Sequence, residues 1–229
     1  MRDEGTNAPL RHDRGYVYRL YEPRDPPERT IVGLHGSGAD ETAILPLARM
    51  LDPRARILAP RGRIMQNGER RWYRKLSPIS FDQSSVRFEA EAFATFLGGL
   101  FREGVVDPER TLFLGYSNGA NLVAATMLLH PGAIRQAVLM RAMPVLEAPP
   151  KADLASARAL ILSGAADETY GAYGAMLAEL LKRNGAVVAS NTLDAGHECG
   201  AGDIAYARNW LDSVAGGVPA TADAGGKRG

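Results

Sequence analysis

The stretch from Arg110 to His130, RTLFLGYSNGANLVAATMLLH, decides the fold class of this chain. Residues 111–115 are a short apolar run after a turn signal, which is typical of a buried strand in a parallel sheet. Residues 120–129 are predominantly apolar and contain neither Gly nor Pro, which predicts a packed helix. Ser117 lies at the joint between the two.

Gly115 and Gly119 flank this serine in the pattern G-x-S-x-G. A strand that turns directly into a helix forces the residue at the turn into strained dihedrals, and side chains two positions away on either side would collide. Such strain costs about 1 to 3 kcal/mol and usually persists only where it serves function. The pattern also occurs by chance. We interpret Ser117 as a nucleophile, with the amide of Asn118 directed at the negative charge that develops in acyl transfer.

Length and composition predict one ordinary globular domain. The chain has 229 residues, of which 45% are apolar and 23% charged, with a net charge of +1 that gives no reason to expect nucleic acid or an anionic membrane as a partner. We expect a single domain over residues 15–215, a flexible N-terminus over 1–14 and a disordered tail over 216–229.

Cysteine usage and the N-terminus bear on the compartment. The single cysteine, Cys199, excludes an intramolecular disulfide and suits a reducing compartment. Residues 1–15 lack the apolar core of a signal peptide, and no segment reaches about 18 apolar residues. We therefore expect a cytoplasmic protein without stable membrane insertion. No Cys/His cluster indicates a metal, and we expect no cofactor.

Strand and helix signals alternate over most of the chain, which predicts a doubly wound, mainly parallel sheet covered on both faces. The connection after residue 140 is too short for a large cap domain. The expected strands are 16–21, 30–34, 55–59, 111–115, 136–140, 157–162 and 186–193. The expected helices are 41–51, from Ser84 or Ser85 to about Arg102, the helix after Ser117, 173–184 and 204–214.

A second informative stretch is His35-Gly36-Ser37-Gly38-Ala39-Asp40, directly after the strand 30–34. A glycine-rich turn there lets the backbone approach a ligand, and in an esterase it supplies the other oxyanion amide, most plausibly that of Ser37. It also reads as an ordinary loop before a helix with Asp40 as N-cap.

Residues 61–83, RGRIMQNGERRWYRKLSPISFDQ, form a connection far longer than usual and without sustained periodicity. Trp72 and Tyr73 lie among Arg70, Arg71 and Arg74. These side chains either line a substrate mouth or pin the loop to the body of the protein.

On a doubly wound fold, serine hydrolases place the nucleophile, the acid and the histidine in that order. Of four histidines, only His197 lies in a loop after the last strand; His12 is in the N-terminus, His35 is in the glycine-rich loop, and His130 fits a helix C-cap. For the acid, Asp167 directly follows its strand, which favours it over Glu168, Asp194 and Glu198.

The motifs HGSGADE, GYSNGAN, GAADE and GHE, in this order and at these separations, resemble the phospholipase/carboxylesterase family of α/β-hydrolases over roughly residues 30–212. The 61–83 loop, GYSNGAN and LMRAMPV are similar to the small bacterial carboxylesterases linked to hydroquinone stress. The acyl-protein thioesterases of the family usually carry Gln where this chain has Asn118, a departure that argues against long-chain lipid and acyl-protein substrates.

The resemblance implies an α/β-hydrolase fold, a triad of Ser117, Asp167 and His197, and oxyanion donors at the amides of Ser37 and Asn118. We expect a carboxylesterase that acts on short acyl or aryl esters through an acyl-enzyme. The expected substrate contacts are Arg71, Trp72, Met140 and Arg141. A thioesterase, a lactonase, a small peptidase or a non-catalytic binding protein is the alternative. The expected partner is a small-molecule ester, and the sequence leaves a homodimer open.

Overall fold

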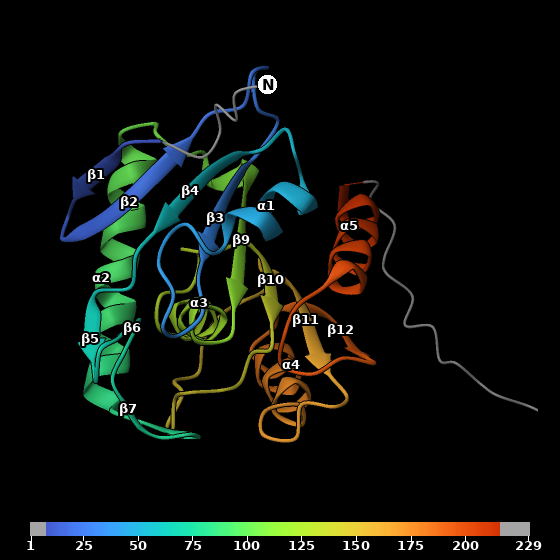
Figure 1. Ribbon diagram of the computed structural model, residues 1–229. Helices are drawn as coiled ribbons and strands as arrows, with labels where there is room; N and C mark the ends of the chain where they lie inside the picture. Colours follow the sequence, from blue (N-terminus) through green and yellow to red (C-terminus); the bar gives the residue numbers. More distant parts are fainter. Residues whose placement is uncertain (1–7, 216–229) are drawn as a thin grey trace, which may run out of the picture.

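The computed structural model describes residues 8–215, and its centre is a sheet of eight strands in the order β1-β2-β4-β3-β9-β10-β11-β12 (Figure 1). The strands are β1 (Leu10–Asp13), β2 (Tyr16–Tyr21), β3 (Thr30–Leu34), β4 (Arg56–Pro60), β9 (Thr111–Tyr116), β10 (Gln136–Met140), β11 (Arg158–Gly164) and β12 (Val187–Leu193). All neighbours from β4 to β12 pair in parallel, whereas β1 with β2 and β2 with β4 pair antiparallel. The predicted doubly wound, mainly parallel sheet is confirmed.

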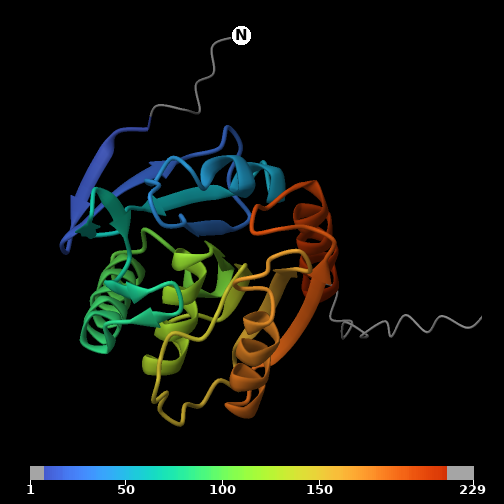
Figure 2. The ribbon, with the colours of Figure 1, turned by 60° about the horizontal axis from the view of Figure 1, so that its bottom comes forward.

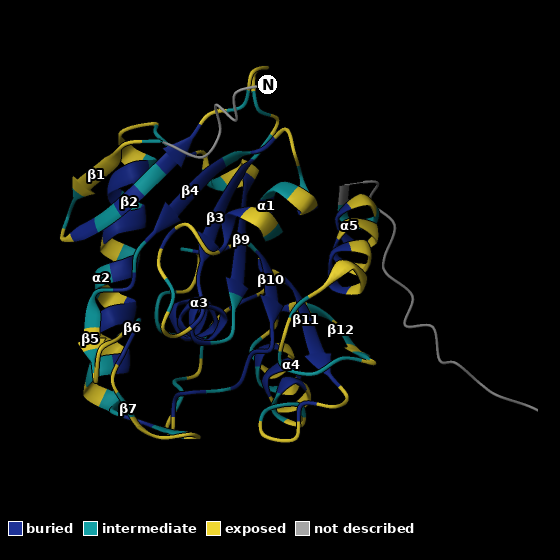
Figure 3. Cartoon of the chain, in the orientation of Figure 1, coloured by how far each residue is buried: buried dark blue, intermediate teal, exposed yellow. Residues whose placement is uncertain are grey.

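Five α-helices among residues 8–215 cover both faces of this sheet: α1 (Leu45–Leu51), α2 (Gln83–Arg102), α3 (Asn118–Leu129), α4 (Tyr173–Arg183) and α5 (Ala201–Ala215). Helices α1 and α5 lie on one side of the strands, and α2, α3 and α4 on the other (Figure 2). Strand side chains alternate between the two faces. In β10, for example, Ala137 and Leu139 pack toward α3, while Val138 and Met140 pack toward α1 and α5. The central strands are therefore buried along most of their length, with partly or fully exposed residues only at their ends (Figure 3).

The N-terminal region contains a strand that we did not predict. Residues 1–14 were expected to be flexible, but Leu10–Asp13 form the edge strand β1, paired with β2. Arg14 and Gly15 connect the two with φ of 46° and 77°. Positive φ at both turn residues matches the twist of a two-residue hairpin. The expectations for residues 1–7 and 216–229 lie outside the described residues.

The 61–83 connection is more regular than its sequence pattern indicated. It folds into two small hairpins, β5 (Ile64–Gln66) with β6 (Glu69–Arg71) and β7 (Lys75–Ser77) with β8 (Ser80–Phe81). Asn67 and Gly68 form the first turn with φ of 54° and 79°. Asn-Gly is the strongest short-range hairpin signal, so this element was predictable from the sequence.

Two helix starts differ from expectation. Helix α1 begins at Leu45 rather than at Glu41, because Pro46 has no N–H and favours the first turn of a helix. The Asp40 carboxylate caps no helix and instead accepts hydrogen bonds from the backbone and hydroxyl of Thr42. Helix α2 begins two or three residues early, because its N-cap is Asp82, whereas Ser84 or Ser85 was expected as the N-cap. His130 is the C-cap of α3, as predicted.

The connection between β10 and β11, residues 141–157, contains neither a helix nor a strand. Within residues 8–215, no helix combines the length and the apolar character that a membrane crossing requires. The edge at which the parallel strands end is therefore bordered by loops and by the two small hairpins.

Candidate active site

Ser117 lies between β9 and α3 in a backbone conformation that is unusual for a non-glycine residue. Its φ is 50° and its ψ is −116°, and its amide donates to Met140 O at 2.8 Å. A Cβ at Gly115 would lie 2.5 Å from Ala120 Cα, and one at Gly119 would lie 2.5 Å from Leu34 O. The expected steric reason for both glycines is confirmed.

His197 and Asp167 are brought to this serine by loops that follow β12 and β11. His197 Nε2 lies 2.9 Å from Ser117 Oγ, and His197 Nδ1 lies 2.6 Å from Asp167 Oδ2. The other carboxylate oxygen of Asp167 accepts from Tyr170 N at 3.0 Å. The two loops are also joined directly, because Ala166 N donates to Ala195 O at 3.0 Å.

The competing acidic residues do not reach the imidazole. Glu168 is exposed, and one carboxylate oxygen of Glu198 accepts from the amide of Gly196 at 3.3 Å. Asp167, in contrast, has a side chain that is only 5% exposed and faces the ring. The side chain of His197 stays 34% exposed, so a reactant can approach it from solvent.

The glycine-rich loop after β3 lies against the start of α3. Its His35 ring is buried, which lowers the pKa of the imidazole through desolvation. His35 Nε2 accepts from Gly62 N at 3.0 Å, so Nδ1 carries the proton and faces Gly36 O at 2.7 Å. This histidine is thus held as a neutral structural group of the loop.

Hydrogen bonds from the hairpin β5–β6 hold the same loop. Arg70 O accepts from Gly38 N at 2.8 Å, and Arg71 Nη1 donates to Ser37 Oγ at 2.9 Å. Ser37 and Asn118 line the same hollow as Ser117. The amide of Asn118 is the first of helix α3 and has no intrahelical acceptor.

Trp72 does not form a wall of the mouth, contrary to the sequence expectation. Its side chain has no exposed surface, and its indole Nε1 donates to His35 O at 2.8 Å. Its amide donates to the side-chain oxygen of Asn118 at 2.8 Å. A fully buried indole needs a partner for its N–H, and the glycine-rich loop supplies one. Trp72 pins the loop to the body of the protein, which was the other interpretation.

Met140 and Arg141 are also not placed as substrate contacts. The Met140 side chain is fully buried on the α1 and α5 face of the sheet, and its carbonyl accepts from Ser117. Arg141 borders the hollow around Ser117, but its side chain has no exposed surface and pairs with Asp203 at 2.7 Å. A buried arginine requires such a partner. No sequence pattern indicated that Asp203, 62 residues away, would be that partner.

Arg71 also lines the hollow around Ser117, and its side chain is partly exposed, at 14%, in contrast to that of Arg141. Its guanidinium pairs with Glu69 and contacts Ser37. Sequence reasoning missed Lys75, which lines the same hollow one hairpin further on. The rest of the lining is mainly apolar or neutral and includes Pro78, Phe81, Asn121, Met143 and Tyr170.

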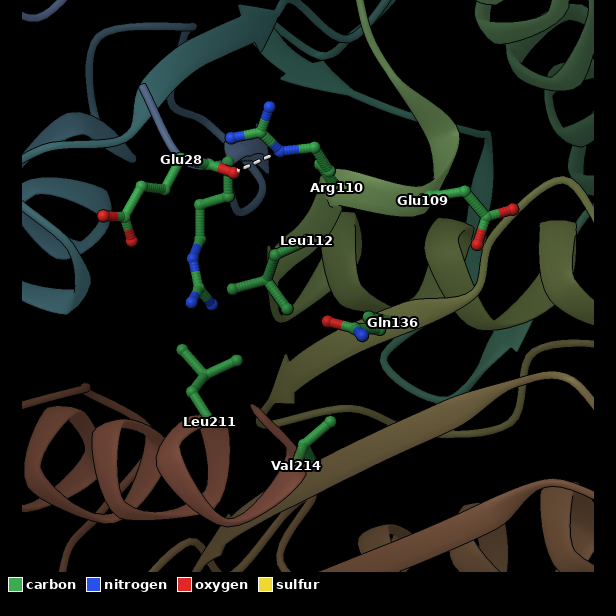
Figure 4. A pocket seen from close by; sticks show the side chains of 8 residues that line it. Glu28, Glu109, Arg110, Leu112, Gln136, Leu211 and Val214 are labelled. Atoms are coloured by element: carbon green, nitrogen blue, oxygen red, sulfur yellow. Dashed lines mark hydrogen bonds between the residues drawn. The ribbon is translucent and has the colours of Figure 1, made fainter. Parts of the chain in front are cut away.

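A second hollow lies at the opposite end of the sheet, where β9 and β10 begin (Figure 4). Leu112, Leu211 and Val214 face it, and Arg110 Nε closes one side by donating to Glu28 O at 2.6 Å. It contains no nucleophile paired with a base. Among the described residues, no group of three or more His, Cys, Asp or Glu side chains is arranged to hold a metal ion.

A mainly parallel sheet with a serine, an imidazole and a carboxylate linked at its carboxyl edge defines the class of α/β-hydrolases. Residues 17–198 match the family described as Phospholipase/Carboxylesterase, and the chain belongs to this family. The family expected from the motifs is thereby confirmed, and with it an enzyme that hydrolyses esters.

Three relatives illustrate the similarity. A carboxylesterase from Mesorhizobium loti is 45% identical, with a TM-score of 0.86 over 90% of this chain and 99% of its own. The Bacillus cereus carboxylesterase is 29% identical, with a TM-score of 0.81 over 86% of this chain and 94% of its own. The Bacillus subtilis (strain 168) protein named "Putative hydrolase MhqD" is 27% identical over 80% of this chain and 92% of its own length.

Proposed function

We propose that this protein is a serine carboxylesterase in which Ser117 is the nucleophile, His197 the general base and Asp167 the acid that orients it. The observation that carries the proposal is the chain of two contacts, 2.9 Å from Ser117 Oγ to His197 Nε2 and 2.6 Å from His197 Nδ1 to Asp167 Oδ2. With Nδ1–H donated to the carboxylate, Nε2 is left as the acceptor for the serine proton.

The reaction proceeds in two steps on this geometry. Ser117 Oγ attacks the ester carbonyl while His197 takes its proton, and the imidazolium then gives that proton to the leaving alkoxide. The amides of Ser37 and Asn118 hold the negative charge of the tetrahedral intermediate. Water, activated by the same imidazole, hydrolyses the acyl-enzyme and frees Ser117.

Short acyl or aryl esters fit the site best. The hollow around Ser117 has a volume of only about 40 Å³, well below the roughly 300 to 1,000 Å³ typical of ligand pockets, which favours a small acyl group over a long chain. Phe81, Met143 and Tyr170 provide apolar contact area without forming a long channel. An acetate or propionate ester of a phenol matches this combination.

The charges at the hollow favour an ester that also carries a carboxylate. Arg71 and Lys75 line it, no acidic residue does so within the described part of the chain, and the buried Arg141 is already paired with Asp203. A unit charge about 5 Å away contributes about 1 to 3 kcal/mol at effective dielectric constants of about 80 to 20. Since Glu69 offsets Arg71, Lys75 carries most of the preference.

The triad is tested with Ser117→Ala, which should lower kcat/KM for p-nitrophenyl acetate by about 10³-fold or more and abolish labelling by a fluorophosphonate. Ser213→Ala, whose hydroxyl bonds Trp210 O in α5, is the matched control and should keep both. Undiminished labelling of the Ser117 variant would contradict the assignment. Wild-type activity on acyl-CoA, lactone and small peptide substrates tests the alternatives that use the same chemistry, namely a thioesterase, a lactonase and a small peptidase.

The charge preference is tested with a neutral aryl acetate and its carboxylated analogue at low and high salt. The carboxylated ester should have the higher kcat/KM, by about 5-fold or more since 1 kcal/mol corresponds to about 5-fold, and the gain should shrink with salt. Lys75→Ala should remove most of the gain. Arg74→Ala, in the same loop but exposed and outside the hollow, should leave it. Equal values for both esters in the wild type would exclude the preference.

A further inference from the structure

The loop that carries His197 is fixed by side chains from two neighbouring strands. Residues 194–200 join β12 to α5 and contain no helix or strand. Three consecutive carbonyl groups of this loop nevertheless accept hydrogen bonds: Gly196 O from Arg141 Nε at 2.8 Å, His197 O from Tyr116 Oη at 3.0 Å, and Glu198 O from Arg141 Nη2 at 2.7 Å.

The guanidinium of Arg141 is itself fixed by burial and by hydrogen bonds. Its side chain has no exposed surface, and Nη1 and Nη2 bond the two carboxylate oxygens of Asp203 at 2.7 and 3.1 Å. Nη1 also reaches Leu162 O at 3.4 Å. With the bonds to the histidine loop, five contacts use all five N–H groups of the guanidinium. Asp203 Oδ2 in turn accepts from Gly200 N at 2.9 Å, which ties the end of the loop to the start of α5.

The backbone at Arg141 carries strain that its local sequence does not require. Its φ is 55°, and it directly follows β10, just as Ser117 with φ of 50° directly follows the neighbouring β9. A non-glycine residue in this region is strained and usually persists where the surrounding structure serves function. A buried ion pair is by itself weak evidence for stability. Strain and burial together therefore need an explanation beyond packing.

Tyr116 supplies the middle contact. Its ring packs 5.6 Å from the His197 ring, centroid to centroid, and lies close enough to Gly36 that a Cβ there would be 2.9 Å from it. Burial raises the pKa of Tyr116 to about 12, so the hydroxyl keeps its proton and remains a donor to His197 O.

We propose that Arg141 and Tyr116 are positioning residues that hold the Gly196-His197-Glu198 backbone so that His197 Nε2 stays at hydrogen-bond distance from Ser117 Oγ. Neither touches the reacting atoms through its side-chain donors. This inference rests on the proposed function, because it assumes that His197 is the base. It predicts that loosening the loop slows the chemical steps and leaves substrate binding intact.

The test compares Tyr116→Phe and Arg141→Lys with wild type in steady-state kinetics. Tyr116→Phe removes one donor and keeps the ring, and Arg141→Lys keeps the charge opposite Asp203 but loses the planar fork. Because a misplacement of about 1 Å costs about 100-fold in rate, each variant should lower kcat roughly 10- to 100-fold with KM within about 2-fold. Proton NMR supplies a second signal, since the His197 Nδ1–H resonance of the bond to Asp167 should broaden in both.

Matched controls for the two variants are a tyrosine in β2 and an arginine in β4. Tyr21→Phe removes a buried hydroxyl that has no hydrogen-bond partner. Arg56→Lys alters an arginine that also joins a carboxylate, Glu22, to a loop carbonyl, Val105 O, but does so at the amino end of β4. Both controls should keep kcat and the His197 resonance.

The outcomes separate this inference from the proposed function. Activity in Ser117→Ala would overturn the proposed function. Inactive Ser117→Ala together with wild-type kcat in folded Tyr116→Phe and Arg141→Lys would overturn the positioning role alone. If Arg141→Lys does not fold, Tyr116→Phe decides: an unchanged kcat and an unchanged His197 resonance would refute the inference.

Discussion

Gly119→Ala tests whether the turn at Ser117 and the glycine-rich loop are built as one unit. A Cβ at this position would lie 2.5 Å from Leu34 O and 2.6 Å from His35 O, both of them backbone atoms. Carbon and oxygen do not approach closer than about 3.0 Å, so the two segments would have to separate by at least about 0.5 Å. His35 O cannot yield freely, since it accepts from Trp72 Nε1 at 2.8 Å.

Two effects follow from that separation. Overpacking of this kind typically destabilises a protein by about 1 to 3 kcal/mol. The displaced segment also carries Ser37, so the donor that we assign to the oxyanion moves relative to Ser117. Since about 1 Å of misplacement costs about 100-fold, a shift of half that size should lower kcat/KM by roughly 10-fold.

Gly98→Ala in helix α2 is the matched control. An added Cβ there meets only the end of the Arg102 side chain, at 3.4 Å. Alanine is favoured over glycine inside a helix by about 0.5 to 1 kcal/mol, so this variant should be more stable and equally active. Urea unfolding and p-nitrophenyl acetate hydrolysis measure both quantities. Wild-type stability and activity in Gly119→Ala would refute the steric reasoning, because the clash would then relax at no cost.

Three further outcomes are expected. Asp167→Asn should lower kcat/KM by about 10³- to 10⁴-fold because the imidazole loses its orienting carboxylate, whereas Glu168→Gln, at an exposed side chain, should keep it; the reverse result would move the acid by one residue. Burial alone would raise the pKa of Glu41, but hydrogen bonds from Arg61 and Arg19 lower it to about 2. Its contribution to stability is therefore complete above pH about 4.5 and is lost as pH falls toward about 2, so urea unfolding of Glu41→Gln should show a flatter profile over that range. Burial raises the pKa of Cys199 to about 12, so iodoacetamide should alkylate the native thiol at pH 8 far more slowly than the unfolded one, and Cys199→Ala should stay active.

The parallel strands were predictable because the pattern that marks each strand lies within its own few residues. Strands buried on both faces are short apolar runs, and β3, β9 and β10 have this pattern. The elements that the sequence analysis missed, β1 and the hairpins of the 61–83 connection, are short and partly exposed. Their signal lies in the turns Arg14-Gly15 and Asn67-Gly68 rather than in apolar periodicity.

The linked Ser117, Asp167 and His197 could be anticipated because chain order and strand ends constrain them strongly. Side chains around them could not be placed in the same way. Tryptophan occurs both in cores and in binding sites, and arginine is fully buried only where a partner pairs with it. Their positions depend on partners far along the chain, Asn118 for the Trp72 amide and Asp203 for the Arg141 guanidinium. Local sequence does not encode which partner will be within reach.

Positive φ at non-glycine residues occurs in two settings in this structure, in hairpin turns and beside the Ser117 site. Among residues 8–215, four non-glycine residues have positive φ: Arg14, Asn67, Ser117 and Arg141. The first two precede a glycine in two-residue hairpin turns, where positive φ is what the strand twist requires. The other two directly follow adjacent strands at the carboxyl edge of the sheet, and neither lies in a hairpin turn. One presents the serine hydroxyl, and the other directs a guanidinium beneath the histidine loop. The fold therefore accepts strain at the proposed nucleophile and at the arginine that we propose positions the loop of the proposed base.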